Sequence, residues 1–211
     1  MSFNWVNNNN NYLIYVGDAM CSWCHGFSPE LDQIVKDNSQ FELKLVMGGL
    51  RPFNTEKAID MADFLKSHWV EINERTGQPF SFDILKDESF VYDTEPASRA
   101  IVVARTMKPE IEYDFFKAVQ MAFYRDNKNT NQLETYLPIA AHFGLELNAF
   151  ERFFNGEEIK TRTKADFQLS GRFGIKGFPS LILKHNGSFT QLSSGYTTAY
   201  NVNNIIQEVL N

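Results

Sequence analysis

The two cysteines of the chain, Cys21 and Cys24, stand three residues apart, and His25 follows directly. A Cys-x-x-Cys-His pattern can hold a metal, attach haem, form a structural disulfide or exchange thiols for disulfides. A structural zinc site needs four ligands, and the other three histidines are scattered along the chain, so no metal site is expected. Haem attachment normally follows export, and residues 1–16 lack the basic and long apolar regions of a signal peptide. Thiol exchange is therefore the favoured chemistry.

The composition limits the class of protein and its partners. A chain of 211 residues, 43% of them hydrophobic, can bury a large core without disulfides. Its 20 basic and 26 acidic residues give a net charge of -6 with no extended basic cluster, which argues against nucleic acid as a partner. No apolar run reaches the roughly 20 residues of a membrane span. We expect a soluble, cytoplasmic protein without membrane or nucleic-acid partners, in which a structural disulfide is disfavoured.

A strand and a helix must position the cysteines. The run "YLIYV" at 12–16 reads as a buried strand that ends in a turn at Gly17-Asp18. Apolar residues recur with helical spacing behind the cysteines, which predicts a helix from about Cys21 to Asp37 that contains Pro29. The alternating "FELKLVM" at 41–47 predicts a second strand. Together these elements form a βαβ unit with parallel strands.

Helical periodicity dominates the middle of the chain, and residues typical of strands occur again near its end. An Asn186-Gly187 pair after "PSLILK" predicts a tight hairpin turn. Asn131 with Glu134, and Asn148 with Glu151, have the spacing of capping boxes. We expect helices over about 61–76, 97–107, 112–125, 132–143, 149–156 and 198–210, a strand over 179–184, and an irregular connection between the first two helices.

The helix start assigns different roles to the two thiols. Residues i and i+3 of a helix lie close enough for a disulfide to open and close after small adjustments. The unpaired amides and positive dipole end of the first turn are expected to stabilise a thiolate at Cys21. Cys21 is therefore the expected nucleophile, and Cys24 is expected to resolve the mixed disulfide that Cys21 forms.

The segments "DAMCSWCHGF", "MGGLRPFN" and "GIKGFPSLILKHNG" resemble the DsbA-like branch of the thioredoxin superfamily, and most of all its cytosolic FrnE-like predicted protein-disulfide isomerases. The resemblance spans nearly the whole chain. It implies an α/β thioredoxin fold with a large all-helical insertion. Residues 1–52 and 169–211 would form the thioredoxin-fold domain, and residues 53–168 the insertion.

The resemblance also implies roles for individual residues. Cys21 and Cys24 would be the catalytic thiols, and Pro179 a cis-proline that faces them. Phe178 would offer backbone hydrogen bonds to an extended substrate, a small case of strand addition. Trp23 would either form part of an exposed lip that meets substrate or pack against the insertion. The alternative for Pro179 is that it simply begins a strand.

Three further residues could tune the pair. The intervening dipeptide, Ser22-Trp23, lacks the histidine that stabilises the nucleophile in periplasmic DsbA, so strong oxidant behaviour is not expected. His25 is expected either to tune the thiols or to face solvent without a role. Asp18 is expected to cap the helix or stabilise the turn in preference to acting as an acid.

Other side chains are expected to be structural or exposed. Arg99 follows "YDTEPAS", which resembles a segment that borders related active sites, but a surface position is the simpler expectation. His68 lies on an apolar stripe and is expected in the core. The asparagine run at 7–11 is expected to be a solvated lead-in to the first strand.

The expected function is that of a thiol-disulfide oxidoreductase or isomerase that acts on protein or small-thiol substrates through a Cys21 mixed disulfide. No cofactor is expected, with glutathione a candidate co-substrate. One alternative is a glutathione-dependent transferase or isomerase of the kappa or hydroxychromene-carboxylate type, which the insertion also resembles. Another is a redox-sensing binding module that does not turn over. Oligomeric state is left open.

Overall fold

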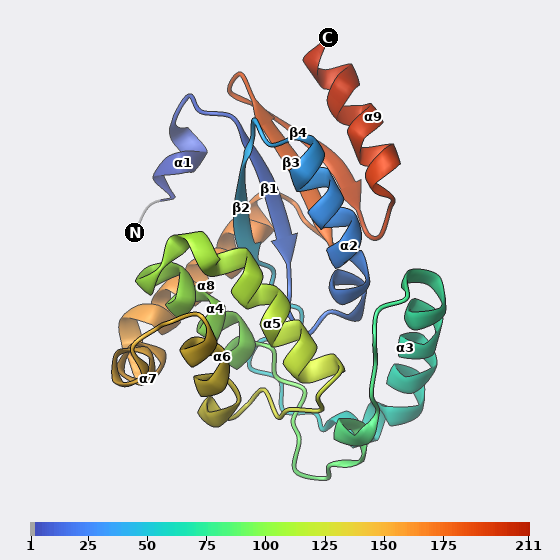
Figure 1. Ribbon diagram of the computed structural model, residues 1–211, viewed down its shortest axis with the longest axis vertical. Coiled ribbons are helices and arrows are strands. Elements are labelled where there is room, and N and C mark those ends of the chain that lie inside the picture. Colours follow the sequence, from blue (N-terminus) through green and yellow to red (C-terminus); the bar gives the residue numbers. More distant parts are fainter. Residues whose placement is uncertain (1–2) are drawn as a thin grey trace.

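The computed structural model describes residues 3–211, and these are built around a four-stranded mixed sheet (Figure 1). The strand order is β2-β1-β3-β4. Strand β1 pairs in parallel with β2 and antiparallel with β3, and β3 pairs antiparallel with β4. The strands span β1 Tyr12–Gly17, β2 Glu42–Met47, β3 Ser180–His185 and β4 Ser188–Ser194. This is a thioredoxin fold with additional helices, as the sequence predicts.

Strand β1 lies in the middle of the sheet and is buried on both faces. Leu13 and Tyr15 point into the core formed with helices α2 (Ser22–Asp37) and α9 (Ala199–Leu210). Ile14 and Val16 point to the opposite face, which is covered by residues of α1 (Asn4–Asn7) and the end of α8 (Glu157–Arg172). Alternate side chains of one strand therefore join two hydrophobic layers.

Helix α2 begins directly after Cys21, which is its N-cap residue with extended backbone. Phe27, Leu31 and Ile34 repeat along its buried face, which is the spacing that predicted the helix. Pro29 lies inside the helix, also as predicted. The strand-to-helix junction that the sequence indicated therefore forms within one residue of its expected position.

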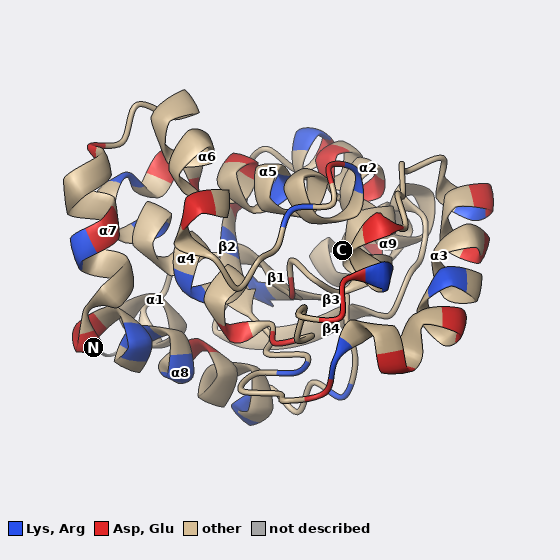
Figure 2. Cartoon of the chain, turned by 90° about the horizontal axis from the view of Figure 1, so that it is seen from below, with Lys and Arg blue, Asp and Glu red and all other residues tan. Residues whose placement is uncertain are grey.

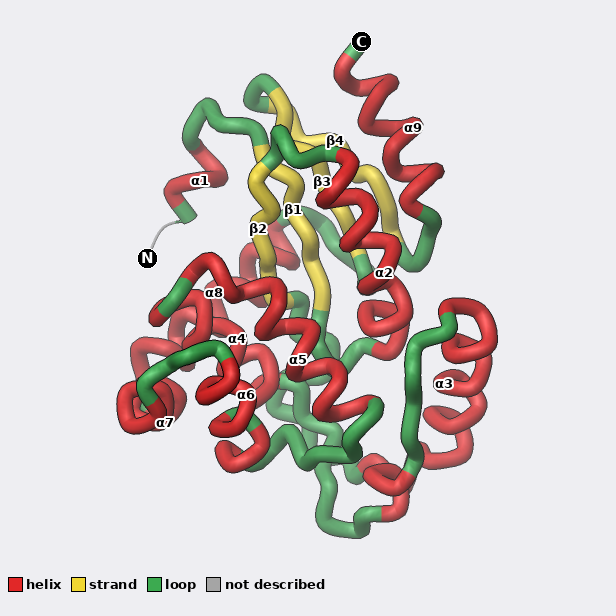
Figure 3. Tube along the Cα trace, in the orientation of Figure 1, coloured by secondary structure: helices red, strands yellow, loops and turns green. Residues whose placement is uncertain are grey.

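The segment between β2 and β3 is helical. Figure 3 shows α3 standing apart from the other helices of this segment, near the beginning of α2. Helix α8 continues from this segment across residue 168 to reach the sheet, so the expected domain boundary falls inside a helix. The helices are α3 Ala62–Thr76, α4 Glu95–Met107, α5 Glu112–Tyr124, α6 Leu137–His142, α7 Leu147–Asn155 and α8 Glu157–Arg172, with short 3-10 helices at Ala58–Met61, Asp83–Lys86, Pro109–Ile111 and Leu133–Thr135.

Two details of the helical segment differ from the sequence predictions. The helix expected over 132–143 is split into a 3-10 turn and α6, because Pro138 occupies the first turn of α6. The capping boxes are wrong. Helix α7 begins earlier, and the carboxylate of Glu146 accepts hydrogen bonds from the amides of Asn148 and Ala149. A carboxylate at the N-cap thus satisfies two of the free amides of the first turn of α7.

The hairpin at the end of the sheet forms as predicted. Asn186 and Gly187 have φ values of 51° and 79°, the left-handed geometry of a type I′ turn. The turn brings β4 back along β3, so that the amide of Gly195 reaches the carbonyl of Pro179 at 2.7 Å. The hairpin thereby fixes the start of β3.

The N-terminal asparagines lead into β1 and Asn7, Asn9 and Asn10 are exposed, but the run is more than the solvated lead-in that the sequence suggested. Residues 4–7 form α1, and the following asparagines surround the ammonium group of Lys184, which is 1% exposed. That group donates to the carbonyls of Trp5, Asn8 and Asn10 and to the side-chain oxygen of Asn8. A buried cation requires such acceptors, so the run is part of the fold.

Acidic and basic residues are interspersed along α3, α7 and α8 (Figure 2). Within residues 3–211, no helix is long and apolar enough to cross a membrane. The same residues contain no group of three or more histidine, cysteine or acidic side chains arranged to hold a metal ion.

Candidate active site

The two thiols lie at the beginning of α2 and differ in exposure. Cys21 is 6% exposed and Cys24 is completely buried, and neither forms a disulfide. The Sγ of Cys21 lies 3.6 Å from the carbonyl oxygen of Phe178 and donates a hydrogen bond to it. Ser22, the first residue of α2, is half-buried beside them. Cys21 is therefore the only residue of the pair with any exposed surface.

The Phe178–Pro179 peptide bond is cis, as the resemblance implied. It lies immediately before β3, the strand that pairs antiparallel with β1. The chain thus brings Phe178 to Cys21 from 157 positions away in sequence. Cys21, Phe178 and Pro179 come together in one place, as expected from the sequence.

Asp18 organises the turn that leads into α2. Its carboxylate accepts hydrogen bonds from the amides of Met20 at 2.9 Å and Leu50 at 2.7 Å, and its carbonyl accepts from the amide of Cys21. The side chain is fully buried, and burial raises its pKa against the effect of these amides. Asp18 therefore has the turn role that was favoured, and it also ties the cysteine loop to the loop after β2.

The loop after β2 approaches the cis-proline segment closely. The amide of Gly48 donates to the carbonyl of Gly17 at 2.7 Å. A Cβ atom on Gly48 would lie 2.3 Å from the ring of Phe178, which is well inside contact distance. The glycine is needed here because two backbone segments and an aromatic ring share the same space.

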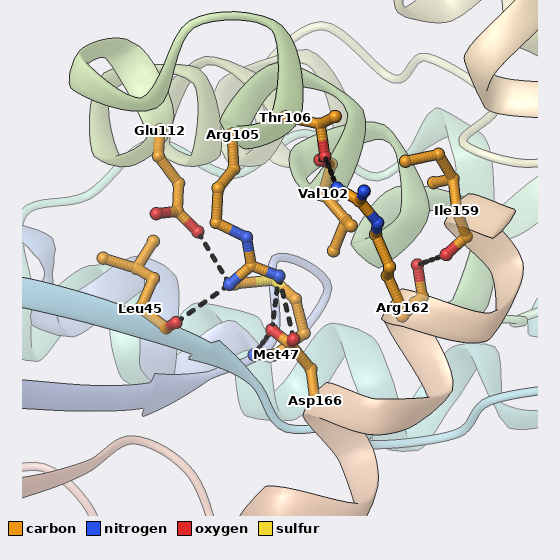
Figure 4. Close-up of polar contacts among 10 residues, drawn as sticks. Leu45, Met47, Val102, Arg105, Thr106, Glu112, Ile159, Arg162 and Asp166 are labelled. Carbon is orange, nitrogen blue, oxygen red and sulfur yellow. Dashed lines mark hydrogen bonds and ion pairs between the residues drawn. The ribbon is translucent and has the colours of Figure 1, made fainter. Parts of the chain in front are cut away.

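An ionic cluster anchors the helical segment to β2 just before this loop (Figure 4). The guanidinium of Arg105, on α4, binds both carboxylate oxygens of Asp166, on α8, at 2.8 and 2.9 Å. It also donates to the carbonyl of Leu45, while Asp166 accepts from the amide of Met47 at 3.0 Å. The end of β2 is therefore held by charged groups from two helices.

Glu112 completes the cluster from α5, with its carboxylate 3.3 Å from Arg105. Burial raises the pKa of Glu112 to about 7, with attraction to Arg105 opposing the rise and repulsion from Asp166 adding to it. The charge of Arg105 is already balanced by the carboxylate of Asp166. A negative charge on the buried carboxyl of Glu112 would have no further cation to balance it and is therefore costly.

Trp23 packs against the helical segment and is half-buried. Its ring lies perpendicular to His68 with centroids 5.7 Å apart, and the guanidinium of Arg75 lies over it and over Tyr196. The sequence left open whether Trp23 forms an exposed lip or packs against the insertion, and the structure shows the packing. His68 is 32% exposed and stacks on Phe64, so its expected place in the core is wrong.

His25 does not face solvent. It is 1% exposed, its ring stacks on Tyr124, and its Nε2 donates to the carbonyl of Pro79 at 3.1 Å. Burial lowers the pKa of His25 to about 4, although the hydrogen bond to the carbonyl of Pro79 acts to raise it. The side chain is therefore neutral near pH 7 and connects α2 to the loop after α3.

Arg99 is not the surface residue that was expected. Its side chain is 13% exposed, pairs with Glu95 at 3.1 Å and donates to the carbonyl of Phe154 at 3.0 Å. It therefore holds α4 and α7 together. The burial of Arg99 could not be predicted from its neighbours in sequence, because its acceptor, the carbonyl of Phe154, is 55 residues away.

The chain matches the model of the DSBA-like thioredoxin domain over residues 13–202. It belongs to the DSBA-like thioredoxin family. The match includes both cysteines, the whole helical segment and the hairpin, so this DSBA-like protein carries the insertion within the family's own domain. No match was found among curated protein sequences.

Solved structures of similar proteins agree with this assignment. A candidate protein disulfide isomerase from Nitrosomonas europaea is 34% identical, with a TM-score of 0.87 over 95% of this chain and 98% of that one. The cytosolic disulfide reductase DsbM from Pseudomonas aeruginosa is 25% identical, with a TM-score of 0.79 over 95% and 100% of the two chains. Its structure with GSH matches with 24% identity and a TM-score of 0.76, over 94% and 98% of the chains.

Two residues that support the site in this DSBA-like protein were missed from sequence. The hydroxyl of Tyr92 donates to the carbonyl of Met20 at 2.7 Å, and the hydroxyl of Thr130 contacts the sulfur of Met20 at 3.2 Å. Both belong to the helical segment, and Met20 directly precedes Cys21. Nothing in the local sequence around either residue points to such a contact.

Proposed function

We propose that the protein is a cytoplasmic thiol-disulfide oxidoreductase that reduces disulfides through Cys21 and Cys24, with glutathione as electron donor. The observation that carries the proposal is the position of Cys21, at the N-cap of α2 and 3.6 Å from the carbonyl before Pro179. Similarity to a cytosolic disulfide reductase, which also matches in its complex with GSH, supports the direction and the donor.

The reaction has two exchanges. The Cys21 thiolate attacks one sulfur of the substrate disulfide, that S–S bond breaks, and the other substrate sulfur leaves with the electron pair and takes a proton. The Cys24 thiolate then attacks the sulfur of Cys21 and releases the second substrate thiol. Substrate gains two electrons and two protons, and the protein is left with a Cys21–Cys24 disulfide. Two glutathione molecules restore the thiols and become one glutathione disulfide.

Burial supports this division of labour. Cys21 is the only residue of the pair with exposed surface, and it lies at the N-terminus of α2, where the helix dipole favours negative charge. Burial raises the pKa of Cys24 well above its ordinary value, and the neighbouring Cys21 raises it further. Cys24 therefore stays protonated while Cys21 is free, and becomes a better nucleophile when Cys21 is tied up in a neutral disulfide.

Substrate would dock beside the cis-proline. The carbonyl of Phe178 is occupied by the Cys21 thiol in the reduced protein, and it becomes available when that thiol loses its proton. An extended peptide or the backbone of glutathione can pair with it as an added strand. Trp23, half-buried against Arg75 and Tyr196, would form one wall of this site.

The dipeptide between the cysteines supports reduction over oxidation. Neither Ser22 nor Trp23 carries a positive charge that would hold Cys21 as a thiolate, and the neutral His25 turns toward Pro79. A dipeptide that adds no positive charge beside the pair gives the reduced form less stabilisation and so makes the disulfide a weaker oxidant. We expect a reduction potential nearer the roughly −270 mV of thioredoxin than the roughly −120 mV of DsbA.

The experiment is turnover of a small disulfide with glutathione, coupled to glutathione reductase. We expect Cys21→Ser to be inactive and Cys24→Ser to accumulate a mixed disulfide that mass spectrometry identifies as one glutathione on Cys21. Equal turnover by wild type and Cys21→Ser would reject the proposal. Redox titration against glutathione then tests the direction, because a potential near that of DsbA would contradict a reductase.

A further inference from the structure

Tyr15 has a buried hydroxyl group without a hydrogen-bond partner among the described residues. The residue is 1% exposed and lies on β1, on the sheet face that packs against α2. Its ring stacks on Phe27 with centroids 6.2 Å apart and meets Phe116 edge-on at 5.8 Å. A phenylalanine would fill the same apolar space without leaving a polar atom unpaired. The hydroxyl therefore calls for an explanation other than packing.

The hydroxyl lies beside Gly17, the last residue of β1 before the turn that leads to Cys21. A Cβ atom on Gly17 would lie 2.8 Å from the Tyr15 oxygen, so the hydroxyl lies under the turn that leads to Cys21. Phe27, on which the ring stacks, is three residues after Cys24 on α2, and residues at this spacing share a helix face. The tyrosine ring and the Cys24 thiol thus occupy the same layer between β1 and α2.

Electrostatic effects agree with this placement. The hydroxyl of Tyr15 acts to lower the pKa of Cys24, against the larger effect of burial. Burial raises the pKa of Tyr15 well above its ordinary value, and Cys24 raises it further. Tyr15 therefore keeps its proton, so its hydroxyl can donate a hydrogen bond to a thiolate but does not serve as the base that removes the proton of the thiol.

We propose that Tyr15 is a positioning residue for the resolving step, in which its hydroxyl donates a hydrogen bond to the Cys24 thiolate. The idea rests on the proposed function. When Cys21 is in a mixed disulfide, Cys24 releases its proton to solvent base and attacks the Cys21 sulfur. The Cys21–Cys24 bond forms, and the substrate sulfur leaves with the electron pair and is protonated by solvent. Tyr15 supplies a charge-assisted donor for the thiolate of Cys24, a residue that is completely buried.

The variant Tyr15→Phe removes only the hydroxyl and keeps the ring in its stack. Tyr12→Phe is the matched control, because Tyr12 lies on the same strand but faces the opposite side of the sheet. Reduced protein is mixed with excess glutathione disulfide, and the glutathione mixed disulfide is followed by acid quenching and mass spectrometry across pH. We expect Tyr15→Phe to resolve it about tenfold more slowly near pH 7, with the rate rising at higher pH than in wild type. Alkylation of Cys21 should be unchanged.

A second measurement does not depend on turnover. In the Cys21→Ala background, the titration of carbon-13-labelled Cys24 is followed by NMR with and without Tyr15→Phe. We expect the variant to ionise at higher pH, and Tyr12→Phe to leave the titration unmoved. An unmoved titration in Tyr15→Phe overturns the proposal even if resolution slows, since the ring would then act through packing alone. If wild type lacks turnover but Cys24 responds to Tyr15→Phe, the proposed function fails and the contact stands.

Discussion

The ring of Phe178 lies so close to Gly48 that only a hydrogen atom fits between them, because a Cβ on Gly48 would be 2.3 Å from the ring. This contact joins two parts of the protein. Gly48 follows Met47, whose amide is held by Asp166 from α8, and Phe178 presents its carbonyl to Cys21. The position of the helical segment is thereby transmitted to the group that meets the nucleophile.

The first prediction is that Gly48→Ala slows reduction of a small disulfide by about tenfold, because the new methyl group displaces the Phe178 ring and with it the adjacent carbonyl. Gly171→Ala is the control. A Cβ on Gly171 meets nothing within 4 Å, and the residue lies inside α8, where alanine favours the helix. Steady-state kinetics of both variants measure the effect. If Gly48→Ala turned over like Gly171→Ala, the close contact would have no role in the site.

The features that the sequence predicted well are local ones. The strand before Cys21, the helix behind it and the Asn186-Gly187 turn each follow from a few neighbouring residues, and each forms where expected. The cis bond at Pro179 was implied by resemblance, since spacing alone does not distinguish a cis-proline from one that begins a strand.

The features that the sequence could not predict depend on distant partners. Met20 is held by Tyr92 and Thr130, which lie 72 and 110 residues away. His25 was open to both tuning and exposure because the loop that buries it, at Pro79, comes 54 residues later. Periodicity identifies which face of a helix is buried, but it does not identify the element that covers that face.

The second prediction concerns His25, whose pKa is lowered by burial to about 4. Below about pH 6.5 His25 is protonated in the unfolded chain, but in the folded protein it stays neutral down to about pH 4. The unfolded state therefore gains stability from this proton, and the free energy of unfolding falls as pH drops from about 6.5 to about 4. We expect the free energy of unfolding of wild type to lose about 2 kcal/mol more than that of His25→Phe between pH 7 and pH 5. Urea unfolding at the two pH values measures the difference.

His142→Gln is the control for this experiment, because His142 is exposed on α6. It should keep the pH dependence of wild type. His25→Phe is expected to be less stable at every pH, since the carbonyl of Pro79 loses its donor. Parallel curves for wild type and His25→Phe would show that the buried ring does not resist protonation.

The third prediction concerns Glu112, which makes the protein less stable as pH rises, whereas His25 makes it less stable as pH falls. Burial raises the pKa of Glu112 to about 7, so the folded protein takes up a proton that the unfolded chain binds only near pH 4.5. The stability that Glu112 contributes is full below about pH 4.5 and is lost as pH rises through about 7. Relative to Glu112→Gln, wild type should lose up to about 3 kcal/mol between pH 4.5 and pH 8. The exposed neighbour Glu110 provides the control variant, Glu110→Gln, and equal pH dependence in all three proteins would contradict the prediction.

The last prediction concerns Lys184, which holds the N-terminal segment against β3. Its ammonium group is buried and donates to the carbonyls of Trp5, Asn8 and Asn10. Lys184→Met preserves most of the side-chain volume but leaves these acceptors unpaired, which should cost about 2 kcal/mol. The loss should be concentrated in residues 4–11, whose amides we expect to exchange with solvent much faster than in wild type. Lys36→Met, at an exposed position of α2, should leave both stability and exchange nearly unchanged. Uniform loss of protection across the sheet would instead mean that Lys184 stabilises the core and not the segment, because an anchor for the N-terminus predicts that the interior strands β1 and β3 exchange as slowly as before.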